Sequence, residues 1–134
     1  MTDEPEFDHE ELIRYIKGVR RIVINAKYGG FSLSLEAKQL YLKRSMIEYT
    51  TVDRASRDET TRYGPLIIVD TDIWESRNVK RDDPILVDVV RDLKEKANGQ
   101  YAKLKIVEIP ADVKWAIAEI DGREWIEEVH RTWE

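Results

Sequence analysis

The hydrophobic pattern near the start of the chain predicts a strand, a tight turn and a helix in succession. Residues 21–26 form an apolar, β-branched run that predicts a buried strand. Gly29 and Gly30 follow it and predict a turn with positive φ. Ser34 stands at the N-cap position of a helix with an apolar face formed by Ala37, Leu40, Tyr41, Met46 and Ile47. Strands that end in glycines and lead into a helix often carry binding sites, because backbone amides and a helix N-terminus converge there.

A short helix is predicted before this strand. Asp8 or His9 opens it, and Asp8 with Glu11 has capping-box spacing. Its apolar positions recur at helical spacing and are Leu12, Ile13, Ile16 and Val19. Residues 1–7 precede it as a disordered acidic tail without an apolar core, so no secretory signal is expected.

The middle of the chain predicts a strand and a helix separated by polar loops. Residues 65–70 are a short apolar strand, and residues 50–64 and 71–83 are expected to be loops, together a variable region at about 50–83. Asp82 or Asp83 precedes Pro84, a strong start for a helix that ends at Asn98-Gly99. The two loops carry six basic residues among many carboxylates: Arg54, Arg57, Arg62, Arg77, Lys80 and Arg81.

The last third of the chain predicts β-structure. Residues 104–109 are an expected strand, and Asp121-Gly122 is a strong hairpin signal between residues 113–120 and 123–132. A two-residue turn pairs Ile120 with Arg123 and sets the rest of the register: Glu119 with Glu124, Ile117 with Ile126, Trp115 with Glu128, and Val113 with His130. The alternative is a helix, because Trp125, Ile126, Val129 and Trp133 also fit one helical face.

Together these elements predict a single α/β (α+β) domain over residues 8–134. We expect a mixed sheet of four to five strands, which includes the C-terminal β-hairpin, and about three helices. A chain of 134 residues is long enough to form one hydrophobic core.

Composition narrows the classes of function. Apolar residues make up 42% and charged residues 37% of the chain, and its net charge of −5 makes direct nucleic-acid binding unexpected. The absence of cysteine excludes disulfides, thiol catalysis and cysteine-based metal sites. No window approaches the apolar length of a membrane helix, so we expect a cytoplasmic protein without a membrane partner.

Four segments of the chain carry a family resemblance. They are residues 24–34, with Tyr28-Gly29-Gly30-Phe31-Ser32-Leu33-Ser34, and residues 81–84, 107–110 and 121–133, the last with His130-Arg131-Thr132-Trp133. In these segments the chain resembles a family of small bacteriophage-encoded proteins of unassigned function. Many relatives have a cysteine where this chain has Lys27. The resemblance implies a phage origin, and with it host modulation or anti-defence, but no catalytic residue.

The glycine turn is the main candidate for a ligand site. Its backbone amides and the following helix N-terminus suit a phosphate or carboxylate, while Lys27 would add charge and Tyr28 would stack on a ring. The predicted ligand-binding residues are Lys27, Tyr28, Gly29, Gly30, Ser32, Ser34 and Arg81. The alternative is that the glycines only make a tight turn.

Candidates for catalysis are weaker. Asp70 and Asp72 follow a buried strand at the spacing of some magnesium sites, although a strand-ending turn is the simpler interpretation. His130 would share a hairpin face with three glutamates as an acid/base group or on a solvated strand edge: Glu119, Glu124 and Glu128.

We therefore expect a phage-type accessory protein that binds a host protein or a small ligand and is not an enzyme. The alternative is a nucleotide-binding, nucleotide-sequestering or phosphoester-processing protein that uses the Gly29-Gly30 turn for a phosphorylated ligand. No metal or cofactor is expected, except Mg²⁺ under this alternative. An exposed Trp133 and a free strand edge would also allow a homodimer.

Overall fold

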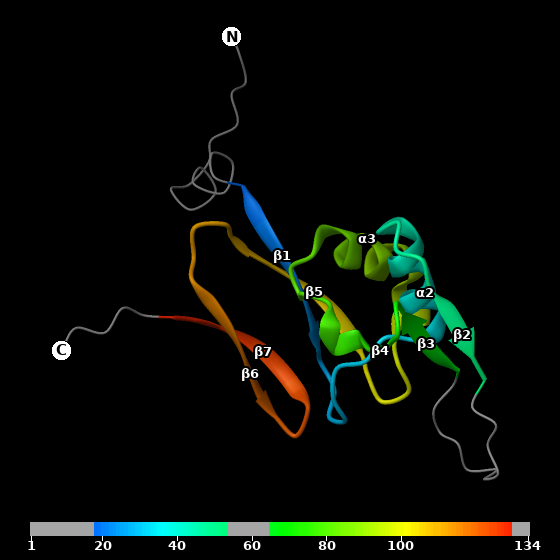
Figure 1. The fold of residues 1–134 in the computed structure, drawn as a ribbon. Helices are drawn as coiled ribbons and strands as arrows, with labels where there is room; N and C mark the ends of the chain where they lie inside the picture. Colours follow the sequence, from blue (N-terminus) through cyan, green and yellow to red (C-terminus); the bar gives the residue numbers. More distant parts are fainter. Residues whose placement is uncertain (1–17, 54–64, 130–134) are drawn as a thin grey trace.

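The computed structural model describes residues 18–53 and 65–129 (Figure 1). The predicted acidic tail, residues 8–17 of the predicted first helix, and the residues His130 and Trp133 lie outside the described ranges. Val19, which was expected in that helix, instead begins β1. The class is mixed α and β, as predicted. The described elements in chain order are β1 (Val19–Asn25), α2 (Leu35–Arg44), β2 (Thr50–Val52), β3 (Leu66–Val69), β4 (Asp72–Trp74), η1 (Ser76–Asn78), α3 (Pro84–Leu93), η2 (Lys94–Ala97), β5 (Leu104–Pro110), β6 (Trp115–Ile120) and β7 (Arg123–Glu128).

A two-stranded antiparallel ribbon of β1 and β5 lies at the centre of the fold. Its register runs from Val19 opposite Pro110 to Asn25 opposite Leu104. Side chains alternate between its two faces, and both faces carry aliphatic residues. Strands with apolar residues on both faces are typical of ribbons covered on two sides. The β1–β5 ribbon is therefore a middle layer.

Helix α3 packs on one face of the β1–β5 ribbon, and α2 packs against α3 (Figure 1). Both helices begin as predicted. The Ser34 side chain accepts a hydrogen bond from the Ala37 amide, and Asp83 accepts one from Ile85 with Pro84 in the first turn. Their shared core with this face of the ribbon includes Val23, Leu42, Leu86, Val89, Leu104 and Ile106.

The β6–β7 hairpin lies over the other face of the β1–β5 ribbon. The predicted register is confirmed from Ile120 opposite Arg123 to Trp115 opposite Glu128, and the helical alternative for residues 123–128 is wrong. The Asp121-Gly122 turn explains this result, because both residues have positive φ, as a hairpin turn of this type requires. The fold thus has three layers: helices, the β1–β5 ribbon and the hairpin.

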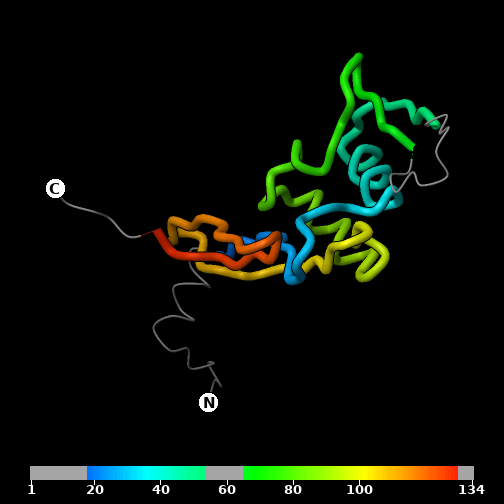
Figure 2. The backbone as a smooth tube through the Cα atoms, turned by 90° about the horizontal axis from the view of Figure 1, so that it is seen from below, coloured from blue at the N-terminus to red at the C-terminus, as the bar shows by residue number. Residues whose placement is uncertain are grey.

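The prediction of one mixed sheet is wrong. The described strands form three separate sheets, and every pair is antiparallel. The loops expected at residues 50–64 and 71–83 also contain strands, because β2 and β4 pair with the two edges of β3. Each of these strands is only three residues long, too short for a periodic signal. This three-stranded sheet lies at the opposite end of the molecule from the hairpin (Figures 1 and 2).

Candidate functional site

The Gly29-Gly30 turn packs against the tip of the hairpin. Both glycines have positive φ, as predicted, and the Gly29 amide donates a hydrogen bond to the Asp121 carbonyl at 3.0 Å. Gly122 packs so closely that a Cβ atom on it would lie 2.2 Å from the Gly30 nitrogen. The turn therefore has a structural role in holding the hairpin, and the Gly29 amide is already hydrogen bonded.

Asn25, at the end of β1, joins the same two segments. It is fully buried, and its side-chain amide donates to the carbonyls of Lys27 and Gly122 at 2.6 and 2.7 Å. Its Oδ1 atom accepts from the Lys103 amide at 2.9 Å. A buried amide with partners on every side stabilises a unique arrangement, because each unpaired group would cost free energy. Asn25 thus connects the turn, β5 and the hairpin.

A buried ion pair fastens the hairpin to β1. Both terminal nitrogens of Arg81 bind the Glu124 carboxylate, at 2.6 and 2.8 Å, and Glu124 also accepts from the Asn25 amide at 2.8 Å. The Arg81 guanidinium lies 3.4 Å from the centre of the Phe31 ring and donates to the Val23 carbonyl. The guanidinium of Arg81, a predicted ligand residue, thus binds groups of the protein itself.

Four of the predicted ligand residues share a cavity of about 550 Å³. They are Gly29, Gly30, Ser32 and Ser34. Aromatic and polar side chains also line this cavity, among them Trp74, Gln100 and Tyr101. The Ser34 hydroxyl accepts from Ala37 and donates to the Lys96 carbonyl.

The other predicted site residues are not brought to this cavity. Lys27 and Tyr28 are exposed and do not line it, and Arg81 lies with the hairpin. Asp70 has a positive φ and forms the β3–β4 turn, which agrees with the simpler of its two interpretations. The described residues contain no group of three carboxylate, histidine or cysteine side chains placed to hold a metal.

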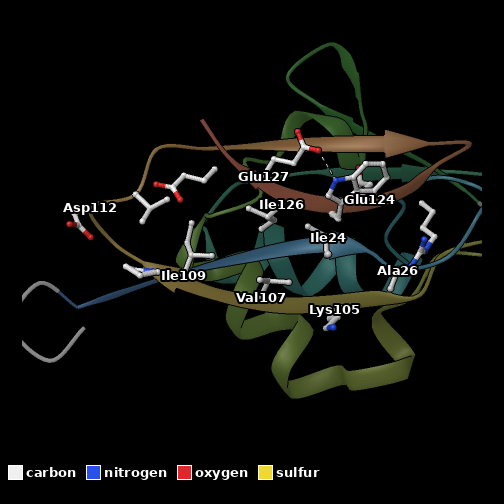
Figure 3. Close-up of a pocket in the computed structure, with 14 residues that line it drawn as sticks. Ile24, Ala26, Lys105, Val107, Ile109, Asp112, Glu124, Ile126 and Glu127 are labelled. Atoms are coloured by element: carbon white, nitrogen blue, oxygen red, sulfur yellow. Dashed lines mark hydrogen bonds between the residues drawn. The ribbon is translucent and has the colours of Figure 1, made fainter. Parts of the chain in front are cut away.

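A cleft of about 750 Å³ opens between the hairpin and the β1–β5 ribbon (Figure 3). Ile24 and Val107 form its floor on the ribbon, and Ile126 points toward them from β7. Ile109, Pro110 and Val113 extend the apolar lining. The sequence analysis missed this cleft, because it forms only when strands about 100 residues apart meet. The one sequence signal was the apolar residues on both faces of the central strand.

Charged residues of both signs also line the cleft. Its carboxylates are Asp112, which follows Pro110, Glu128, and Glu127, whose carboxylate accepts a hydrogen bond from the Trp125 indole nitrogen at 2.9 Å (Figure 3). Its cations are Lys105 and Arg123. Glu124 lines the cleft too, but its charge is paired with Arg81. The cleft thus combines an apolar centre with charged residues of both signs.

Comparisons of the chain with family models, with curated proteins and with solved structures gave no match. Within residues 18–53 and 65–129, no helix has the length and apolarity needed to cross a membrane.

Proposed function

We propose that this protein acts by binding a segment of another protein in the cleft between the hairpin and the β1–β5 ribbon. The observation that carries the proposal is the apolar cleft itself, which has the size of a binding pocket and a charged rim. Contiguous apolar surface left uncovered on a protein is commonly an interaction site. The partner segment would place aliphatic side chains between Ile126 and Val107.

Two further features support protein binding. Strand β5 pairs only with β1, and β7 pairs only with β6, so each has an edge without a described strand partner. Such edges can bind an extended peptide through main-chain hydrogen bonds. The resemblance to small bacteriophage proteins, a prediction from the sequence, favours a host cytoplasmic protein as the partner and a role in host modulation or anti-defence.

A peptide-library selection on the full chain tests this proposal. We expect peptides enriched on the wild-type protein to lose binding to Ile126→Asp, because the new carboxylate lies in the apolar centre of the cleft. Ile120→Asp is the matched control, since Ile120 is exposed on the same hairpin and does not line the cleft. Peptides that bind wild type and both variants equally would contradict the proposal.

The second candidate function is binding of a small phosphorylated ligand in the cavity that contains Gly29, Gly30, Ser32 and Ser34. This candidate is supported by the convergence of these four predicted residues beside Trp74 and Tyr101, whose rings could stack on a base. A thermal-shift screen with linear and cyclic nucleotides, with and without Mg²⁺, tests it. Ligand at about 100 times its dissociation constant should stabilise the fold by about 2.7 kcal/mol. A Tm unchanged throughout the screen would rule out this candidate for the nucleotides tested.

A further inference from the structure

The outer edge of β7 borders the cleft. All six residues of this strand line the cleft, whereas β5 contributes the alternate residues Lys105, Val107 and Ile109. Alternate residues of a strand lie on one face of a sheet, while a run of consecutive residues lines a cavity where the edge of the strand borders it. Strand β6, which is described throughout, contributes no residue. The cleft therefore lies beside β7 and over one face of the ribbon (Figure 3).

The main-chain groups on this edge of β7 belong to Glu124, Ile126 and Glu128. The Val129 amide donates a hydrogen bond to the Lys114 carbonyl at 2.8 Å, so the main chain of Val129 points toward the strand across the hairpin. This direction alternates from residue to residue in an antiparallel pair. The amides and carbonyls of Glu124, Ile126 and Glu128 thus point away from β6, and no other described strand pairs with β7. The edge offers main-chain donors and acceptors at every second residue.

A strand added to this edge would place alternate side chains on the ribbon. Ile126 points from β7 toward the ribbon (Figure 3). The residue of the added strand directly opposite Ile126 would have its side chain on the same face. That side chain would lie against Val107, in the apolar centre of the cleft, and should therefore be aliphatic.

Two charged side chains also lie on the faces that the added strand would contact. Glu128 is on the same face of β7 as Ile126, and Lys105 stands opposite Ile24 on the ribbon. Neither side chain forms an ion pair with another described residue. A basic residue of the partner would complement Glu128, and an acidic residue would complement Lys105.

The direction of β7 determines the order of these two charges. Glu124, near the start of β7, accepts a hydrogen bond from the Asn25 amide, and Asn25 stands opposite Leu104. Strand β7 therefore starts near the Lys105 end of β5, and Glu128 lies farther from that end. A partner strand antiparallel to β7 would reach Glu128 first and Lys105 last.

We infer that the cleft binds an extended segment of another protein as a third strand, antiparallel to β7. The inference rests on the proposed function, in that the cleft is the docking surface, and it specifies the partner. The segment presents a basic, an aliphatic and an acidic residue, in this order, at alternate positions. Main-chain hydrogen bonds to β7 supply affinity, and the side chains that contact the ribbon supply specificity.

Methylation of peptide amides tests the strand pairing. A random peptide library is selected on the full chain, and each amide of an enriched peptide is N-methylated in turn. We expect the affinity to fall about tenfold at every second residue, because only alternate amides of an added strand donate to β7. Losses at consecutive residues, or at none, would overturn the inference. The proposed function would still stand if binding depended on Ile126, whereas a selection that yields no peptide would contradict both.

Amide exchange in the protein identifies the strand that binds the peptide. We expect saturating peptide to slow deuterium exchange of the Ile126 and Glu128 amides about tenfold. The Glu108 amide is the control. The Ala26 amide donates to the Lys103 carbonyl, and by alternation the Glu108 amide points away from β1, on the outer edge of β5. Slowing at Glu108 instead of Ile126 would place the peptide on β5 and overturn the inference.

Charge reversal tests the direction of the added strand. We expect Glu128→Lys to weaken binding of the enriched peptides about tenfold, and the exposed control Glu119→Lys, outside the cleft, to leave it unchanged. Enriched peptides with the acidic residue first would overturn the antiparallel direction. A homodimer that excludes the peptide, detected by light scattering, would also overturn the inference, because a second copy would then occupy the edge.

Discussion

At the residue scale, side-chain hydrogen bonds and an ion pair hold the hairpin to the rest of the protein. Glu119 and Glu124 stand directly opposite each other in the hairpin, an arrangement that is unfavourable for like charges. Arg81 relieves the repulsion between the two glutamates, because it binds Glu124 through both terminal nitrogens. Glu119 stays exposed to solvent. Arg81, which the sequence analysis expected in a polar loop, thus has a structural role as the partner of Glu124.

Removal of the Glu124 carboxylate should destabilise the protein strongly. We expect Glu124→Ala to lower the free energy of unfolding by about 3 kcal/mol, because it leaves the largely buried Arg81 cation and the Asn25 amide without their partner. Urea denaturation measures this change. Glu119→Ala is the control and should change stability by less than about 0.5 kcal/mol. Similar losses for the two variants would show that the ion pair is not important for stability.

Tyr41 should make the stability depend on alkaline pH. Burial raises the pKa of its hydroxyl above the ordinary value of 10.0, and the hydrogen bond to Asp83, at 2.6 Å, raises it further. Between these two pKa values the folded state binds more protons than the unfolded state, so stability falls as pH increases. The contribution is fully present below pH 10.0 and is lost as pH rises through the raised pKa.

The variant Tyr41→Phe isolates this effect. It should lose about 1–2 kcal/mol at neutral pH, because Asp83 loses a hydrogen bond. Above pH 10 its stability should fall less steeply than that of wild type. Urea denaturation at several pH values measures both differences. Identical pH profiles would contradict the assignment of the titration to Tyr41.

At the element scale, the glycine turn and the hairpin tip are in close contact, since a Cβ atom on Gly122 would lie 2.2 Å from the Gly30 nitrogen. We expect Gly30→Ala to cost about 1–2 kcal/mol, from its positive φ alone, because no atom lies within 4 Å of the added methyl group. Gly122→Ala should cost clearly more, because its methyl group would meet the Gly30 backbone. Thermal denaturation compares the two variants, and a smaller loss for Gly122→Ala would contradict the close contact.

Elements with a local signal were predictable from the sequence, and those without one were not. Ser34, Asp83 and the Asp121-Gly122 turn act within a few residues, so both helix starts and the hairpin register were correct. The strands β2 and β4 form because β3 lies between them, and no local pattern records that pairing. The sheet architecture was wrong for the same reason, since β1 pairs with a strand about 80 residues away.

The candidate site was predictable in part. The glycine turn was correctly located, and four residues near it do share a cavity. The roles of Arg81 and Asn25 depend on distances between remote segments, as does the cleft around Ile126. Such tertiary contacts produce no recognisable spacing of residues in the sequence. Whether the cavity or the cleft binds a ligand stays a prediction.

At the scale of the whole molecule, the three layers should differ in protection from solvent. The β1–β5 ribbon is covered on both faces, whereas the hairpin has one face without a covering element among the described residues. We expect the amides of β1 to exchange with deuterium more slowly than those of β6, because they open only when the core opens. Hydrogen exchange followed by NMR measures this order. Faster exchange in β1 than in β6 would contradict the layered description.

The pairing of the first described strand with late ones has a consequence for synthesis on the ribosome. β1 is synthesised about 80 residues before β5, so Ile22, Val23 and Ile24 stay unpaired until the residues from Leu104 onward have emerged. The hydrogen bond between the Asn25 amide and Glu124 forms only after Glu124, close to the C-terminal end of the described residues, has been synthesised. Nascent chains therefore carry an unpaired aliphatic strand until β5 has emerged, and during that time aggregation and chaperone binding compete with folding. The hairpin itself closes locally and needs no such delay.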